Sequence, residues 1–118
     1  MPHLVIEYSQ KLEDTLSIPA LVSNGQQAMS DTGLFNASAI KTRALPYRDF
    51  VLGKSHEGSS NVFIHAEVRI LEGRTVQQKE DLSAAIFNYL CEAAPEVPEI
   101  SVEVREMEKA SYSKRIPF

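Results

Sequence analysis

Residues 62–71, VFIHAEVRIL, decide the fold, because apolar and polar side chains alternate along them. Successive side chains of a β-strand point to opposite faces of the sheet. The positions of one face are all apolar: Ile64, Ala66, Val68 and Ile70. The three central positions of the other face are polar: His65, Glu67 and Arg69. The stretch therefore predicts a strand with one buried face and one polar face.

A helix is predicted directly after this strand, in EGRTVQQKEDLSAAIFNYLCEAAP (72–95). Thr75 and Gln78 have the spacing of a capping box, and Pro95 marks the end of the helix. Four apolar residues are predicted to lie on one face of this helix: Val76, Leu82, Ile86 and Leu90. A further strand is predicted at EISVEVREM (99–107), which completes a strand–helix–strand unit.

The first half of the chain predicts the same order of elements. A strand is expected at PHLVIEYS (2–9), and a second one at ASAIKTRAL (37–45), which Pro46 would end. Between them a helix is expected, with Ser17 as its N-cap and Gly33 as its C-terminal stop. Gly25 in that helix costs about 1 kcal/mol relative to alanine. Residues 46–61 are expected to form a long loop, with a short strand around residues 50–52 as one alternative.

The repeated order predicts a duplicated βαβ unit, each unit right-handed with parallel strands. Two helices on one face of a four-stranded mixed sheet give a two-layer α/β (α+β) sandwich. The length of 118 residues predicts a single domain over residues 1–118.

Composition limits the classes of partner. The net charge is −4, and no basic run suggests nucleic acid binding. No apolar stretch has the length of a membrane span, and no signal-peptide core is present. The single cysteine, Cys91, excludes an internal disulfide and fits the cytoplasm. No spacing of His, Asp or Glu predicts a metal site, and His3 and His65 are interpreted as structural strand residues.

The polar strand faces leave two interpretations open. Since the helices need the apolar side of the sheet, the other side is expected to carry charges of both signs: Lys41, Arg43, His65, Glu67, Arg69, Glu103 and Arg105. Such a face either stands in water, as in many antiparallel sheets, or meets copies of itself in an oligomer. The apolar residues of the tail, Tyr112, Ile116 and Phe118, are expected to pack on a neighbouring subunit.

Pro2 has two possible roles. A proline is tolerated at the first residue of a strand, which would make it unremarkable chemically. A methionine before proline is usually removed, however, and Pro2 would then carry a free secondary amine. Burial and nearby cations lower the pKa of such an amine, so that it becomes a neutral base near neutral pH.

Four stretches resemble, in order, one known family: MPHLVIEYS (1–9), TGLF (32–35), AIKTRA (39–44) and FIHAEVRILEGRT (63–75). They resemble the 5-carboxymethyl-2-hydroxymuconate isomerases of the tautomerase superfamily, to which 4-oxalocrotonate tautomerase and macrophage migration inhibitory factor also belong. The resemblance extends from Pro2 to about Met107, and the N-terminal and GRT segments are its most specific parts.

The resemblance implies a homotrimer with inward-facing sheets, a cofactor-free reaction without a metal, and Pro2 as general base and acid. It also implies that Lys41, Arg43 and Arg74 bind the carboxylates of a dicarboxylate or tricarboxylate substrate. Lys41 stands where relatives carry arginine, and lysine offers a point charge in place of a bidentate fork. Arg74 precedes the expected N-cap of the second helix, where the helix dipole favours an anion.

The predicted function is isomerisation of unsaturated 2-hydroxy or 2-oxo diacids, such as 5-carboxymethyl-2-hydroxymuconate, in the breakdown of aromatic compounds. Two alternatives remain beside it. One is another reaction of the superfamily, namely phenylpyruvate tautomerisation, hydration or dehalogenation. The other is a trimeric relative that binds ligands without catalysis, since fold alone does not fix function.

Overall fold

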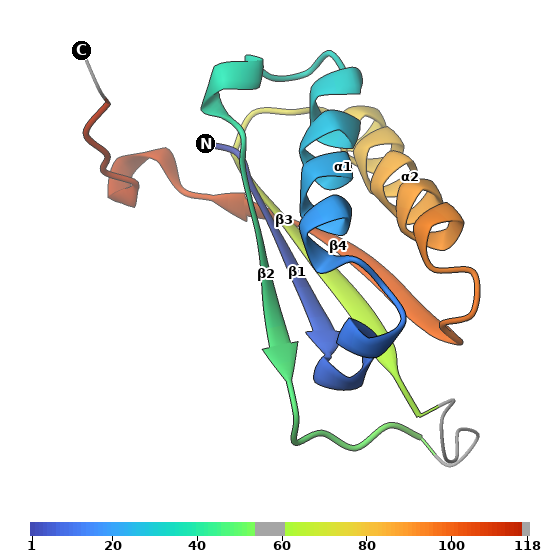
Figure 1. Ribbon diagram of the computed structural model, residues 1–118. Coiled ribbons are helices and arrows are strands. Elements are labelled where there is room, and N and C mark those ends of the chain that lie inside the picture. The colour runs from blue at the N-terminus through green and yellow to red at the C-terminus, as the bar shows by residue number, and fades with distance from the viewer. Residues whose placement is uncertain (54–60, 117–118) are drawn as a thin grey trace.

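The computed structural model describes residues 1–53 and 61–116. Within these ranges one sheet contains four strands in the order β2-β1-β3-β4: β1 (His3–Ser9), β2 (Lys41–Tyr47), β3 (Phe63–Leu71) and β4 (Glu99–Met107). Two long helices, α1 (Ile18–Asp31) and α2 (Val76–Ala93), lie together on one face of this sheet (Figure 1). The predicted two-layer sandwich is confirmed.

The sheet is built from two parallel strand pairs, and the two pairs run antiparallel to each other. β1 pairs with β2 and β3 with β4 in parallel, and each pair is connected by one helix. β1 and β3, the central strands, pair antiparallel. The predicted duplicated βαβ unit is therefore confirmed, and the two halves begin at opposite ends of the sheet.

The core lies between the helices and the sheet. Its largest fully buried side chains come from both layers: Leu4, Ile6, Ile64, Val68, Ile70, Met29, Leu82, Ile86 and Leu90. Gly25 is buried where α1 packs closely on β1 and α2, because a Cβ there would lie 3.1 Å from Leu4 Cδ2 and 3.2 Å from the Tyr89 hydroxyl. Close packing thus explains a residue that propensity alone disfavours.

The predicted helix ends are confirmed. The Ser17 side chain accepts a hydrogen bond from the Ala20 amide at the start of α1. Thr75 and Gln78 form the reciprocal capping box of α2. Gly33, two residues beyond α1, has a φ of 72°, which favours glycine.

Three local predictions are wrong. β2 begins at Lys41, because residues 37–39 form the short 3₁₀ helix η2 (Ala37–Ala39), which the Asn36 side chain caps. β2 continues through Pro46, since it is an edge strand, where a missing backbone N–H can face outward. Residues 50–52 form no strand.

Val76 is also wrongly predicted, because its side chain is 67% exposed whereas Leu82 is buried. Six residues correspond to about 600°, which places Val76 about 120° from Leu82 around the helix axis, at the margin of the buried stripe and in the first position of α2.

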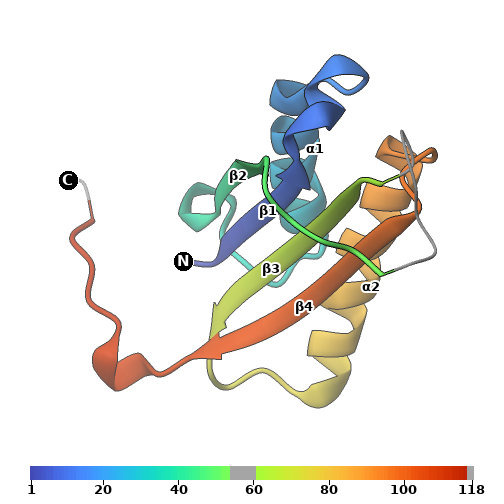
Figure 2. The same ribbon diagram turned by 90° about the horizontal axis from the view of Figure 1, so that it is seen from below.

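The second sheet face is not covered by a helix within the described residues, and we call it the open face (Figure 2). At the end of the sheet where β3 begins, Phe50 packs against Phe63, with ring centroids 5.0 Å apart. Residues 108–116, which include the short 3₁₀ helix η4 (Lys109–Ser111), extend away from the sheet in both views (Figures 1 and 2). Ile116 is 65% exposed, and Phe118 lies outside the described residues.

Candidate active site

Pro2 is buried at the amino end of β1. Its carbonyl accepts a 3.0 Å hydrogen bond from the Lys41 amide, which ties the start of β1 to the start of β2. The connections from α1 to β2 and from β3 to α2 lie at this same end of the sheet (Figure 1). The strand that begins at His3 therefore holds Pro2 at a fixed place among these segments.

The chain terminus lies beside a cation. The Met1 ammonium and Lys41 Nζ both donate to the Ala39 carbonyl, over 2.8 and 3.2 Å. Burial, the neighbouring Lys41 and the charge of Lys114 lower the pKa of the Met1 amine from 8.0 to about 5. An amine at this end of the sheet is thus biased toward its neutral, basic form.

His3 joins the second strand to the C-terminal segment. Its Nδ1 lies 3.0 Å from an Arg43 guanidinium nitrogen, and its Nε2 lies 2.9 Å from the Tyr112 hydroxyl. Burial lowers the pKa of His3, as do the charges of Arg43, the chain terminus, Lys41 and Arg69. His3 is therefore held neutral in a cluster of cations.

Carboxylates neutralise the other cations on the open face. Glu67 pairs with Arg69 and lies 3.7 Å from Arg105, which also contacts Glu103 at 2.6 Å. By contrast, Lys41 and Arg43 contact no carboxylate in the part of the chain that the structure describes. Pro2 is therefore accompanied by two exposed cations that can bind an anion.

Arg74 lies on the connection from β3 to α2 and contacts the α1–β2 connection. One guanidinium nitrogen donates to the Leu34 carbonyl over 2.7 Å, and its Cζ lies 5.2 Å from the centre of the Phe35 ring. The structure thus brings Arg74 to the same end of the sheet as Pro2. No described contact joins it to Lys41 or Arg43.

His65 occupies the centre of a separate network on the open face. Its Nδ1 lies 2.6 Å from Ser101 Oγ, and its Nε2 lies 2.6 Å from a Glu103 carboxylate oxygen. The charges and hydrogen bonds of Arg105, followed by His65, lower the pKa of Glu103. Among residues 1–53 and 61–116, no group of three or more His, Cys, Asp or Glu side chains is arranged to hold a metal ion.

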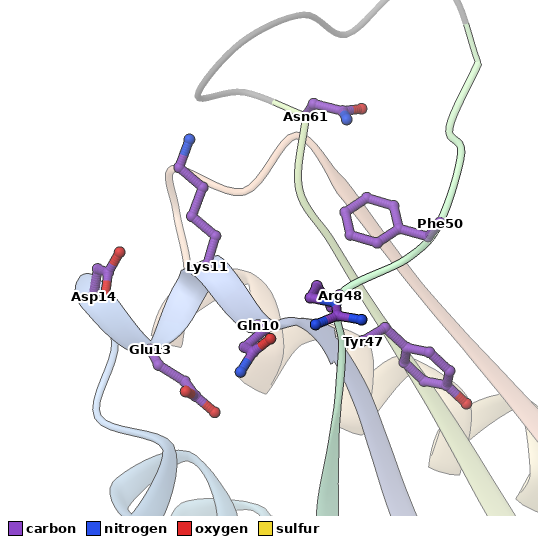
Figure 3. A pocket seen from close by; sticks show the side chains of 8 residues that line it. All are labelled: Gln10, Lys11, Glu13, Asp14, Tyr47, Arg48, Phe50 and Asn61. Carbon is purple, nitrogen blue, oxygen red and sulfur yellow. The ribbon is translucent and has the colours of Figure 1, made fainter.

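A hollow of about 580 Å³ lies at the opposite end of β1, where the strand leads into the 3₁₀ helix η1 (Gln10–Asp14). Figure 3 shows its lining: Gln10, Lys11, Glu13, Asp14, Tyr47, Arg48, Phe50 and Asn61. It contains none of the predicted site residues. Of the two cations in this lining, Lys11 and Arg48, the second is mostly exposed and pairs with the adjacent Asp49 at 3.5 Å.

Sequence reasoning missed three residues near the chain terminus: His3, Tyr112, which contacts His3, and Lys114, whose charge acts on the terminal amine. His3 was predicted to be structural, although its position beside Pro2 was a usable signal. Tyr112, for which the sequence predicts no place in the core of its own chain, contacts His3 of the same chain, and its packing on a neighbouring subunit stays a prediction. None of the helices in the described residues is long and apolar enough to cross a membrane.

The sheet of two βαβ units with two helices on one face, and Pro2 buried at the start of β1, agree with the resemblance to the tautomerase superfamily. The family model for 5-carboxymethyl-2-hydroxymuconate isomerase matches residues 2–116, and the chain belongs to this family. It is therefore an isomerase of the tautomerase type.

Solved structures with the same fold include members of this family. A 5-carboxymethyl-2-hydroxymuconate isomerase from Deinococcus radiodurans R1 is 26% identical, with a TM-score of 0.82, over 97% of this chain and 88% of that chain. A 5-carboxymethyl-2-hydroxymuconate delta-isomerase is 18% identical, with a TM-score of 0.79, over 99% and 89% of the two chains. A fused 4-OT trimer shares the fold at 18% identity and a TM-score of 0.72, over 95% and 91%. No curated protein sequence matches the chain.

Proposed function

We propose that the protein isomerises unsaturated 2-hydroxy or 2-oxo diacids, such as 5-carboxymethyl-2-hydroxymuconate, with the amine of Pro2 as general base and acid. Membership of the isomerase family supports the substrate class. The observation that carries the proposal is the pair of cations Lys41 and Arg43 beside the buried Pro2, neither of which contacts a carboxylate among residues 1–53 and 61–116. We place the reaction in the cytoplasmic breakdown of aromatic compounds.

In the proposed reaction, the neutral amine of Pro2 removes the proton of the substrate 2-hydroxyl. The O–H electron pair forms the carbonyl, the conjugated double bonds shift by one position, and the prolinium returns the proton to a distant carbon. Negative charge develops on the dienolate oxygen between these steps. Lys41 and Arg43 bind the carboxylates and stabilise that charge, and no cofactor or metal takes part.

Removal of Met1 tests the role of Pro2, since an amide nitrogen has no basic lone pair. Protein with Pro2 free, verified by mass spectrometry, is compared with protein that retains Met1 behind a short N-terminal extension. A positioned base contributes about 10²–10⁴-fold, so the extended protein should isomerise 2-hydroxymuconate slower by that factor. Equal rates of the two proteins in an ultraviolet assay would refute the role of Pro2.

Substitution of the free cations tests carboxylate binding. Arg43→Ala should lower kcat/KM for a diacid about 10- to 100-fold more than kcat/KM for the monoacid phenylpyruvate. Lys41→Arg is the companion variant, because a planar fork binds a carboxylate through two hydrogen bonds. Improved diacid turnover by Lys41→Arg supports the same subsite, whereas equal slowing of mono- and diacids by Arg43→Ala contradicts it.

We further propose that the protein is a homotrimer in which the open faces meet. Surface ion pairs contribute under about 1 kcal/mol to stability in water. Closure of three chains into a ring would give the charged side chains of the open face partners on neighbouring subunits. The sheet edges would also gain neighbours. Sedimentation equilibrium at micromolar concentration measures the mass directly, and a mass of one or two chains contradicts the trimer.

A further inference from the structure

The C-terminal segment approaches the amino end of β1 through Tyr112. In addition to the 2.9 Å hydrogen bond, the Tyr112 and His3 rings make an edge-on contact, with centroids 6.0 Å apart at 81°. The side chain of Tyr112 is only partly exposed, whereas the residues around it in the segment are exposed. Tyr112 is therefore the residue that attaches this segment to the site.

The hydrogen bonds fix the tautomer of His3. A guanidinium only donates, so His3 Nδ1 must accept from Arg43 and carries no proton. The proton of the neutral ring is then on Nε2, which donates to the Tyr112 oxygen. Tyr112 thus stabilises the one tautomer in which His3 can accept from Arg43.

The same bonds fix Arg43. Within the described part of the chain, His3 is the only side chain that hydrogen-bonds its guanidinium. An arginine with a single partner has several remaining N–H groups to offer to a ligand. If His3 turned, the long side chain of Arg43 would be free to move in solvent, and the entropy of ordering it would reduce the affinity for a carboxylate.

We propose that the C-terminal segment completes the carboxylate subsite, in that Tyr112 holds His3 and His3 holds Arg43 in place for the substrate. His3 and Tyr112 are positioning residues in this relay. The inference rests on the proposed function for the identity of the ligand. Lys114, two residues after Tyr112, adds positive charge beside the chain terminus and thereby strengthens the same anion subsite.

Binding of trans,trans-muconate tests the relay without turnover, because this dicarboxylate lacks the 2-hydroxyl group that reacts. Calorimetry with Met1-free protein measures its Kd for the wild type, Tyr112→Phe, Arg43→Gln and the double variant. Tyr112→Phe should weaken binding about 3- to 10-fold, as expected for one lost hydrogen bond. In the Arg43→Gln background it should have no further effect, since the relay then has no guanidinium to hold.

Two controls separate positioning from general structural damage. Tyr47→Phe removes another tyrosine hydroxyl, which donates to Glu7 over 2.9 Å at the far end of the open face, and it should leave the Kd unchanged. Nitrogen NMR of His3 should show the Nε2–H tautomer in the wild type. Any of four results would overturn the relay. They are an Nδ1–H tautomer of His3, an unchanged Kd in Tyr112→Phe, additive losses of affinity in the double variant, and a wild type that does not bind muconate.

The outcomes distinguish the inference from the proposed function. If Pro2-dependent turnover occurs while Tyr112→Phe leaves the Kd unchanged, the function stands and the relay is wrong. If the variants show the coupled loss of muconate affinity while 2-hydroxymuconate is not turned over, the relay stands and the proposed reaction is wrong.

Discussion

Substitution of Lys41 should raise the pKa of the terminal amine. In the structure the Met1 ammonium and Lys41 Nζ reach the same carbonyl oxygen over 2.8 and 3.2 Å, so the two nitrogens lie within about 6 Å of each other. Two like charges at that distance repel by about 0.7 kcal/mol in water and about 3 kcal/mol at an effective dielectric constant of 20. Since 1.36 kcal/mol equals one pKa unit, Lys41→Gln should raise the pKa by about 0.5–2 units.

The assay follows the terminal amine directly. Protein with a ¹³C-labelled first residue is titrated by NMR, both with Met1 retained and with Pro2 free. In the free form the acid limb of the kcat/KM profile should also move to higher pH, because a larger fraction of the base is then protonated.

Two variants serve as controls. Lys114→Gln should raise the pKa less, because its charge is the smallest of the causes that lower it. Lys11→Gln should leave it unchanged, because Lys11 lines the hollow at the opposite end of β1. A pKa that stays constant or falls in Lys41→Gln would refute the electrostatic reasoning.

Three further predictions concern Arg74, Gly25 and His3. Arg74→Ala should slow the turnover of a diacid about 10- to 100-fold more than the turnover of phenylpyruvate, as expected if Arg74 binds a carboxylate. Equal slowing of both substrates, together with a lower Tm, would show that Arg74 acts only through its contacts with Leu34 and Phe35. Gly25→Ala should destabilise the protein by up to about 2 kcal/mol in urea unfolding, because overpacking against Leu4 and Tyr89 exceeds the gain of about 1 kcal/mol in helix propensity. The control Asn24→Ala, at an exposed position of α1, should stabilise the protein. A stabilised Gly25→Ala variant would show that the neighbouring side chains move to make room. Because the pKa of His3 is lowered in the folded state, the unfolded chain binds more protons, so stability should fall as the pH drops below about 6.5, and His3→Asn should flatten this dependence; an identical slope in the variant would contradict it.

Local patterns predicted the elements well, because their causes lie within a few residues. The alternation of β3 and the capping box of α2 are such cases, and β4 has the predicted bounds. Pro46 was misjudged because its effect depends on whether the strand is at an edge of the sheet, which only the topology decides.

The site was predictable only in part. Pro2, Lys41 and Arg43 could be proposed from the sequence through the resemblance, and the structure brings them to one end of the sheet. The contact between His3 and Tyr112 joins residues 109 positions apart, and it depends on the path of the chain after β4. No periodicity or local motif encodes such a contact.

The antiparallel pairing of β1 with β3 provides a comparison inside the molecule. Val62 precedes β3 as Pro2 precedes β1, and both residues are buried. In register, β1 begins opposite Lys41, whereas β3 begins opposite Glu99, and Ser101 lies where the first half has Arg43. The same backbone thus appears twice, once with cations and once with an acid and a hydroxyl. Introducing lysine at position 99 and arginine at position 101 would show whether the scaffold alone, without a chain terminus, can bind anions at the end of the sheet where β3 and β4 begin.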